Sequence, residues 1–251
     1  MKRGTRRPAA RRAVVPVVIA VALGTTGCGV LPSLPEPVPS NIVPSRPAAL
    51  EPAGGGDSLS PDGFDAVQRM AVRIRNVGCD ELSTGSGFAV GDHTLITNRH
   101  VVANSDNLQV STYDGRDIEV GTAATAGLAD LAIVRTREEL PSFPELARRD
   151  PEQGDEVMIA GYPSGGELTI TSGRVVGSTR DPLHANLGEV LVTDAKVEPG
   201  SSGSAALDTR GRVIGVVYAK TAEDDSLLVP ISTVREMLAD ADEFTAVAGC
   251  R

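Results

Sequence analysis

The 251-residue sequence predicts an all-β fold that ends in a short helix. Glycine (27 residues) and proline (17) are abundant, tryptophan is absent and aromatic residues make up 3%, which favours a loop-rich β domain over a helical one. Apolar and β-branched segments also recur after residue 70, separated by Gly-rich or Asp-rich breaks. Many short strands at close spacing indicate a sandwich or barrel, and the region from 60 to 251 is long enough for two small barrels.

Each expected strand is a short apolar or β-branched run. The expected strands lie at 71–77, 87–90, 94–97, 108–111, 118–123, 131–136, 156–160, 168–176, 190–193, 213–218 and 227–229. Short helices are expected at 64–70 and 231–238, the second from its apolar periodicity.

Residues 1–27 have the composition of an export signal. Basic residues crowd positions 2–12, and an apolar stretch follows at 13–23. That stretch is short for a membrane-spanning helix, which needs about 20 apolar residues, although an uncleaved anchor is the alternative. Thr25-Thr26-Gly27-Cys28 resembles a bacterial lipobox, so we expect Cys28 to carry a lipid. The protein is then expected on the outer face of the cell membrane, or secreted.

Residues 28–59 form a linker in this interpretation. The Pro-rich run at 31–37 and the glycines at 54–56 are incompatible with a helix or a central strand. Proline-rich chain is semi-extended and would hold a domain away from the membrane; plain disorder would have the same consequence. The folded domain is therefore expected at 60–251.

The charge of the chain disfavours acidic partners. The formal net charge is -9, and a product that begins at Cys28 would carry 18 basic against 33 acidic residues. No basic patch for nucleic acid is evident. No cluster of cysteine and histidine indicates a metal, and no cofactor is expected.

Three short segments carry candidate chemistry. His100 follows the expected strand 94–97 directly, whereas the other two histidines lie in polar turns. Asp130 precedes an apolar strand, where an unpaired carboxylate would be costly to bury; a turn aspartate is the alternative. Ser202 lies in Gly200-Ser201-Ser202-Gly203, where glycines permit a tight turn with converging backbone N–H groups. A flexible Gly/Ser loop is the alternative there.

Taken in order, these segments resemble the trypsin-like serine proteases, and most closely the bacterial HtrA-like branch. The resemblance lies in the runs 97–102, 130–134 and 193–203, with further matches at 161–163, 171–173, 213–216 and 229–231. It covers about 71–240 and implies a chymotrypsin-like fold of two six-stranded antiparallel β-barrels. It implies an endopeptidase acting on proteins or peptides through a triad of His100, Asp130 and Ser202, with the N–H groups of Gly200 and Ser202 as oxyanion hole.

The sequence also departs from the pattern of the family. Ser201, Ser204 and Ala205 stand where the family usually has Asn, Gly and Pro, which puts the rate in doubt more than the activity. Only about a dozen residues follow the terminal helix, so no PDZ domain is expected. A catalytically weak or inactive lipoprotein that acts as a binding module is the alternative function, and a purely structural surface lipoprotein is a third.

Two sets of residues bear on the substrate preference. The position six residues before the nucleophile, an Asp in proteases that cut after Lys or Arg, is Lys196 here. The resemblance places the pocket wall at Val216, Val217, Tyr218 and Ala219, up to Lys220. Asp194 is present, but the HtrA-like branch has an Asp there and favours aliphatic residues, so a small or aliphatic residue is expected before the cleaved bond. The sequence does not indicate an oligomeric state.

The cysteine count predicts one disulfide. Three cysteines are an odd number for an exported protein, but lipid on Cys28 leaves Cys79 and Cys250 as a pair. An oxidising exterior favours their bonding; two free thiols are the alternative. The bridge would fasten the end of the chain to the start of the domain.

Overall fold

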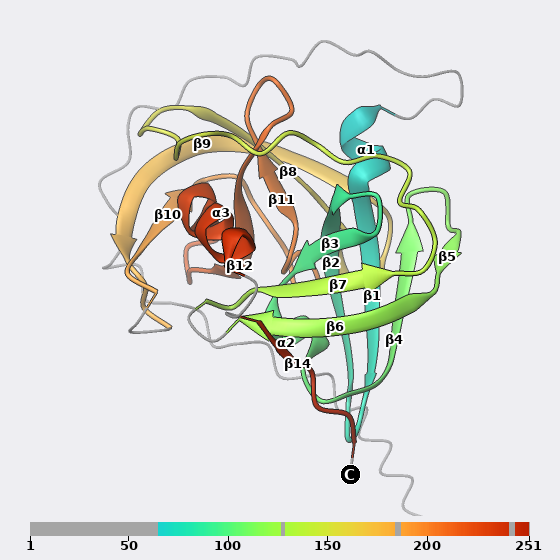
Figure 1. Cartoon of the computed structure of the whole chain (residues 1–251). Coiled ribbons are helices and arrows are strands. Elements are labelled where there is room, and N and C mark those ends of the chain that lie inside the picture. Colours follow the sequence, from blue (N-terminus) through green and yellow to red (C-terminus); the bar gives the residue numbers. More distant parts are fainter. Residues whose placement is uncertain (1–64, 127–128, 184–186, 241–243, 251) are drawn as a thin grey trace, which may run out of the picture. The chain divides into compact units, whose positions relative to one another are not determined.

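Residues 65–126, 129–183, 187–240 and 244–250 are described by a computed structural model (Figure 1). The expected export segment (1–27), the lipidation site Cys28 and the linker (28–59) lie outside these residues. The helices of the described residues are α1 (Ala66–Met70), α2 (Arg99–Val102), α3 (Ile231–Ala239) and the 3-10 helix η2 (Pro163–Gly165). None of them has the length and apolar character that a membrane crossing requires.

The described region contains fourteen strands. They are β1 (Ala71–Gly78), β2 (Leu82–Gly91), β3 (Thr94–Thr97), β4 (Ser105–Thr112), β5 (Asp117–Ile118), β6 (Val120–Ala126), β7 (Ala132–Thr136), β8 (Glu156–Gly161), β9 (Thr169–Arg180), β10 (Glu189–Thr193), β11 (Ala205–Leu207), β12 (Val213–Lys220), β13 (Ser226–Pro230) and β14 (Phe244–Ala246). All the strand pairs within the two sheets are antiparallel.

The N-terminal half is one curved sheet of eight strands in the order β14-β6-β7-β3-β2-β1-β4-β5. Along β1, Val72, Ile74 and Asn76 are buried while Arg73 and Arg75 are more exposed, as expected when alternate side chains face the core. β5 pairs with β4, β6 pairs with β7, and a single residue separates β5 from β6. The chain itself, rather than a hydrogen-bond ladder, therefore links β5 at one edge of this sheet to β6, which lies next to the other edge strand, β14.

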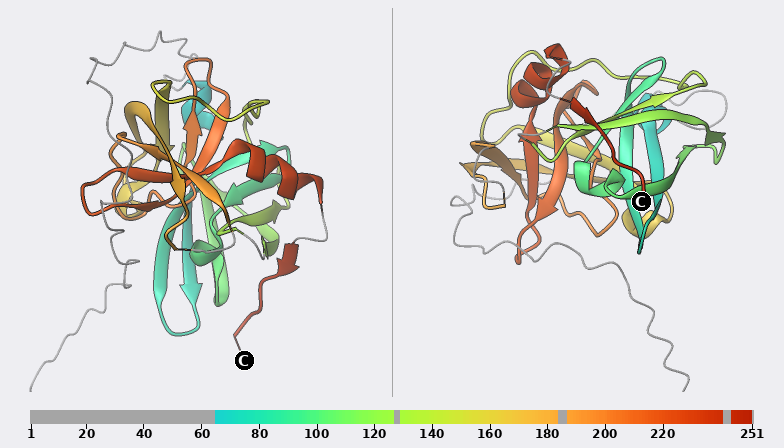
Figure 2. Two further views of the ribbon diagram at one scale, coloured as in Figure 1. Left: turned by 90° about the vertical axis from the view of Figure 1, so that its left-hand side faces the viewer. Right: turned by 60° about the horizontal axis from the view of Figure 1, so that its bottom comes forward.

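The C-terminal half is a closed barrel of six strands in the order β10-β13-β12-β11-β8-β9. The ladder between β9 and β10, with Leu191 opposite Ser178, completes the circle. Helix α3 follows β13 directly and contacts β12 and β13, so it lies on the outside of the barrel (Figure 2). Its buried residues Ile231, Val234 and Met237 follow helical spacing.

The two halves share a hydrophobic core. Its larger cluster consists mainly of barrel residues but also includes Phe88, Ile96 and Leu131 from the N-terminal half. A smaller cluster, with Ile74 and Val134, fills the inside of that sheet. The large cluster holds the segment 129–131, so this segment is fixed at the junction of the two halves.

The structure confirms the predicted all-β fold with its short C-terminal helix. The N-terminal half differs in detail from a six-stranded barrel, because the run 117–126 is split into β5 and β6 and the chain end adds β14. Strands β11 and β14 and helix α2 were not among the expected elements. Cys79, just after β1, forms a disulfide with Cys250, and their Cα atoms lie 5.4 Å apart.

Candidate active site

His100 and Asp130 are brought together by the register of β3 and β7. Thr97 at the end of β3 lies opposite Ala132 at the start of β7. The segment that follows β3 therefore lies next to the segment that precedes β7. Helix α2 starts at Arg99 and buries Val101 and Val102. Its short turn leaves His100 on the outer side, next to Asp130.

Asp130 binds His100 through both of its carboxylate oxygens. Oδ1 accepts a hydrogen bond from the backbone N–H of His100 at 3.1 Å, and Oδ2 accepts one from the ring Nδ1. The Asp130 side chain is 5% exposed, whereas that of His100 is 39% exposed. An ionised carboxylate can only accept, so Nδ1 carries the ring proton and Nε2 keeps its lone pair. The exposed imidazole is therefore arranged to accept a proton at Nε2.

The backbone around Asp130 is fixed as well. Its carbonyl accepts hydrogen bonds from Nδ2 of Asn98 at 2.7 Å and from the N–H of Arg99 at 3.3 Å. Nε of Arg99 lies 4.0 Å from Oδ1 of Asp130. The carboxylate thus has donors and a positive charge beside it, which compensates its burial.

Ser202 is the most accessible serine of its turn. Between β10 and β11, Ser201 and Ser204 are buried, whereas Ser202 is half-buried. The glycines that flank this turn adopt left-handed backbone conformations, with φ of +94° at Gly200 and +88° at Gly203. A Cβ on Gly203 would also lie 2.1 Å from the carbonyl oxygen of Ser86, so glycine is required there for both conformation and space.

Two backbone N–H groups of the turn stay available. Those of Ser201, Gly203 and Ser204 donate to carbonyls of Glu198, Val217 and Ser201, respectively. Within the described residues, the N–H groups of Gly200 and Ser202 have no such acceptor. Paired, unengaged N–H groups beside a serine are what an oxyanion hole requires.

The turn is docked onto the strand that leads toward His100. The N–H of Ser86 in β2 donates to the carbonyl of Ser202 at 2.8 Å. β2 pairs with β3, with Phe88 opposite Ile96, and β3 runs directly into the segment of His100. The three predicted triad residues therefore lie where the two halves meet: His100 and Asp130 belong to the N-terminal half and Ser202 to the C-terminal half.

The residues predicted to form the substrate pocket divide into two groups. Val216, Val217, Tyr218 and Ala219 are buried in β12, and the carbonyl of Val217 accepts a hydrogen bond from the N–H of Gly203 in the Ser202 turn. Lys196 is exposed, and its Nζ donates to the carbonyl of Glu223 at 3.2 Å. The Lys196 ammonium group is thus at the surface.

Two residues of β12, Tyr218 and Lys220, have acidic neighbours and raised pKa values. The phenol of Tyr218 donates to Oδ1 of Asp181 at 2.8 Å; burial, with the negative charges of Asp181 and Asp130, raises its pKa. Nζ of Lys220 lies 2.9 Å from Asp224 and 3.7 Å from Glu198. The hydrogen bond to Asp224 is the main reason that the pKa of Lys220 is raised.

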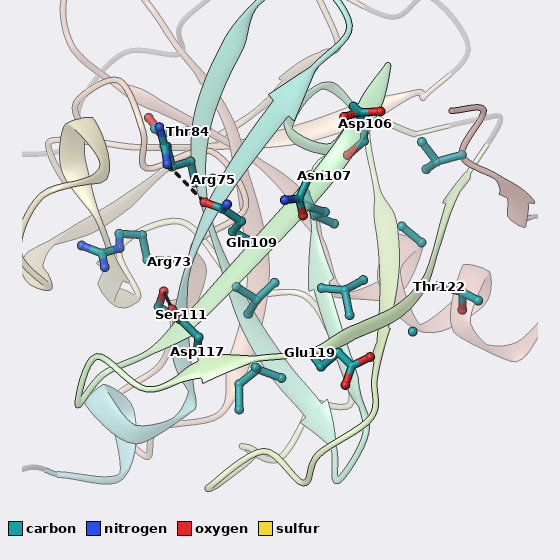
Figure 3. Close-up of a pocket in the computed structure, with 18 of the residues that line it drawn as sticks. Arg73, Arg75, Thr84, Asp106, Asn107, Gln109, Ser111, Asp117, Glu119 and Thr122 are labelled. Carbon is teal, nitrogen blue, oxygen red and sulfur yellow. Dashed lines mark hydrogen bonds between the residues drawn. The ribbon is translucent and has the colours of Figure 1, made fainter. Parts of the chain in front are cut away.

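A separate groove of about 1060 Å³ opens on the N-terminal sheet, between β4 and β6 (Figure 3). Arg75 and Gln109 are hydrogen-bonded at its rim, and none of its lining residues belongs to the predicted triad or oxyanion hole. Within the described residues, no three His, Cys, Asp or Glu side chains gather as metal ligands would. The candidate active site consists of Asp130 with its hydrogen bonds to His100, together with the Ser202 turn.

Comparison with known proteins identifies the family. The model of the trypsin-like peptidase domain matches residues 85–216. The chain belongs to this family. It is 30% identical to serine protease Rv3671c of Mycobacterium tuberculosis over 222 residues, covering 84% of this chain and 53% of that protein. It is 29% identical over 172 residues to a probable periplasmic serine endoprotease, DegP-like, of Hahella chejuensis, covering 66% and 37%.

A solved structure agrees with this assignment. The active form of the Rv3671c protease matches with a TM-score of 0.65 and 26% identity, over 81% of this chain and 97% of that one. The chain spans about half of the length of the Rv3671c relative and 37% of the Hahella chejuensis relative. The trypsin-like family is therefore shown for the region around His100, Asp130 and Ser202.

Sequence reasoning did not identify Ser86 or Ser164. Ser86 is buried and contacts the Ser202 turn from the other half of the molecule. The N–H of Ser164 donates to the carbonyl of Pro199 at 2.5 Å. The sequence Gly85-Ser86-Gly87 could have pointed to Ser86, because glycines inside a strand mark a close approach of another backbone.

Proposed function

We propose that this protein is a serine endopeptidase that hydrolyses peptide bonds through Ser202, His100 and Asp130. The observation that carries the proposal is the buried Asp130 carboxylate that binds both the backbone and the ring of His100. The accessible Ser202, with two unengaged N–H groups in its turn, supports it. The names of the relatives, a serine protease and a serine endoprotease, agree with it.

The proposed reaction proceeds by an acyl-enzyme. The Ser202 Oγ bonds to the scissile carbonyl carbon as its proton passes to Nε2 of His100. The N–H groups of Gly200 and Ser202 bind the oxygen that becomes negative. The C–N bond then breaks, and the proton moves from Nε2 to the leaving amine. Water repeats the sequence on the ester, so that the carboxylic acid leaves and Ser202 recovers its proton.

Asp130 acts on His100 rather than on the substrate. Its hydrogen bond fixes the tautomer that leaves Nε2 able to accept a proton, and its charge stabilises the imidazolium that forms. Because the carboxylate is almost completely buried, its field at the ring is weakly screened.

The direct test is hydrolysis of an unfolded protein substrate such as casein by the full chain. We expect wild type to release peptides and Ser202→Ala to release none above background. Ser111→Ala is the matched control, because Ser111 donates to Asp117 in the N-terminal sheet, away from the Ser202 turn. Equal hydrolysis by wild type and Ser202→Ala would refute the assignment, and an inactive wild type would favour a binding module.

We also propose that the chain is exported and anchored by lipid on Cys28. The basic and apolar runs before Thr25-Thr26-Gly27-Cys28 support this, as does the periplasmic name of the Hahella chejuensis relative. Wild type should partition with membranes, and Cys28→Ala should be released or remain unprocessed. An N-terminus cut elsewhere on a wholly soluble wild type would overturn the proposal.

For the substrate pocket, we propose that β12 lines one wall and that the enzyme prefers a small or aliphatic residue before the cleaved bond. The position that carries Asp in Lys- and Arg-specific proteases is Lys196, so this chain lacks a carboxylate there. Without that carboxylate, a basic substrate side chain has no opposite charge at this position to pair with. A cleavage profile on a peptide library checks this, and frequent cuts after Lys or Arg would contradict it.

A further inference from the structure

The buried residue Ser86 in β2 contacts the Ser202 turn at two points. Its side-chain Oγ donates to the carbonyl of Gly200 at 2.8 Å, and its N–H donates to the carbonyl of Ser202 at 2.8 Å. Gly200 and Ser202 are the two residues whose N–H groups we assign to the oxyanion hole. One residue of the N-terminal sheet therefore holds both ends of the segment that must orient these groups, Gly200 through its side chain and Ser202 through its backbone.

The same hydroxyl also holds a second loop. Oγ of Ser86 accepts the N–H of Tyr162 at 2.8 Å, at the start of the turn 162–165. Two residues later, the N–H of Ser164 donates to the carbonyl of Pro199 at 2.5 Å. A trans peptide points its C=O and N–H in opposite directions. Because the Pro199 carbonyl is held on the side of Ser164, the N–H of Gly200 points to the opposite side.

Ser164 has an unusual conformation for a residue with a side chain. Its φ is +53° and its ψ is 21°, in the left-handed region, which is uncommon outside glycine and unfavourable for β-branched residues. Ser164 is exposed. This conformation presents its N–H to Pro199, so the backbone strain coincides with the contact that orients Gly200.

The surroundings of Ser86 leave it little freedom. Oγ1 of Thr97 donates to its carbonyl at 2.7 Å. A Cβ on either flanking glycine would collide: with Val101 at 2.6 Å from Gly85, and with the Ile96 carbonyl at 2.9 Å from Gly87. The strand is thus pressed against its neighbours at this point, and the Ser86 hydroxyl is held in one place.

We propose that Ser86 is a positioning residue for hydrolysis. Its hydroxyl ties the turn 162–165 to Gly200 and so keeps the Gly200 N–H aimed at the oxyanion. The inference rests on the proposed function and deepens it: Ser86 does not touch the substrate, and it acts through the geometry of the oxyanion hole.

The test compares Ser86→Ala, Ser86→Thr and the control Ser111→Ala in the full chain. Each is assayed for kcat and KM on a peptide substrate and for inhibition by a peptide aldehyde, whose adduct with a serine is tetrahedral and carries an oxyanion. Loss of an oxyanion donor lowers kcat by about 10²–10³. We expect Ser86→Ala to lower kcat by at least about tenfold, and by no more than the loss caused by removing an oxyanion donor altogether. KM should change less than about threefold.

The aldehyde separates a positioning role from a merely structural one. Its inhibition constant should rise in parallel with the loss of kcat in Ser86→Ala, and Ser86→Thr, which keeps a hydroxyl, should recover most of both. Ser111→Ala should leave both unchanged. A Ser86→Ala enzyme with kcat within twofold of wild type, or with unchanged aldehyde affinity, overturns the inference. An inactive wild type would overturn the proposed function as well, so the two failures are distinguishable.

If Ser86→Ala fails to fold, Ser164 provides a second test at an exposed position. Ser164→Gly allows the left-handed conformation, whereas Ser164→Val disfavours it. We expect the valine variant to have a lower kcat and weaker aldehyde binding than the glycine variant at equal melting temperature. Equal kcat and aldehyde affinity in the two variants would contradict the role of the Pro199 contact.

Discussion

Removing the disulfide should lower the stability of this domain by several kcal/mol. The bond joins Cys79, next to the end of β1, to Cys250 at the end of the chain, and it spans 171 residues. Cys250→Ser opens this loop without altering a buried residue, because Cys250 is exposed. Its effect therefore falls mainly on the unfolded chain, which gains conformational freedom.

The magnitude follows from the length of the loop. For 171 residues, the chain-entropy relation gives about 17 cal/mol/K, or about 5 kcal/mol at 25 °C. The folded state loses little in return, because β14 adds only three residue pairs with β6 before the tail. We expect Cys250→Ser to lower the free energy of unfolding by about 2–5 kcal/mol, the range observed when native disulfides are removed.

Guanidinium unfolding followed by circular dichroism measures this change. Wild type under oxidising conditions is compared with Cys250→Ser and with wild type after reduction, and Cys28→Ser serves as a control because that cysteine is not in the bridge. Reduced wild type and Cys250→Ser should coincide at the lower midpoint. A change below about 1 kcal/mol in both would refute the loop-entropy reasoning for this chain. If the free energy of unfolding fell in Cys250→Ser but not in reduced wild type, Cys250 would stabilise the domain other than through the disulfide.

Three further predictions address the triad, the core and acid stability. Asp130→Asn should keep the circular dichroism spectrum but lower kcat by about 10⁴, because the amide favours the wrong tautomer of His100; a loss under tenfold would contradict that role. Leu227→Ala removes a fully buried side chain and should cost about 2–5 kcal/mol in urea unfolding. Burial raises the pKa of Asp208, but hydrogen bonds from Arg212 and Arg210 outweigh it and lower the pKa. The ionised Asp208 therefore stabilises the folded domain fully above its ordinary pKa, and this stabilisation is lost as the pH falls through the lowered value. Asp208→Asn should lower the melting temperature at pH 7 but change it little at pH 2, which thermal melts at the two pH values measure.

Most strands could be predicted because their pattern is local. β3 and β12 are short runs of mainly apolar or β-branched residues that are almost entirely buried, and β1 alternates buried residues with more exposed arginines. Strand β11 is different. Its Ala205 and Ala206 have no β-branched pattern, and the strand exists because β8 and β12 pair with it on its two sides. Such a strand is formed by its neighbours and cannot be read from its own residues.

The proposed reacting groups of the candidate site could be named from the sequence, whereas the residues that hold them in place could not. His100, Asp130 and Ser202 each lie beside an apolar strand in a recognisable short motif. Helix α2 is only four residues long, too short to show helical periodicity. The contact between Ser86 and Gly200 joins residues 114 positions apart, and the left-handed conformation of Ser164 has no composition signal. These features depend on how the two halves dock, which local sequence patterns do not encode.

The central claim is that Ser202 is the nucleophile. The turn contains three serines within four residues, and only Ser202 is accessible. Mass spectrometry of the full chain after reaction with a fluorophosphonate distinguishes them, because fragmentation of the labelled peptide locates the adduct on one residue. The account predicts a single adduct per chain, on Ser202, that requires His100 and is absent in His100→Ala. An adduct on Ser201 or Ser204, or labelling of Ser202 that is equally fast without His100, would contradict it.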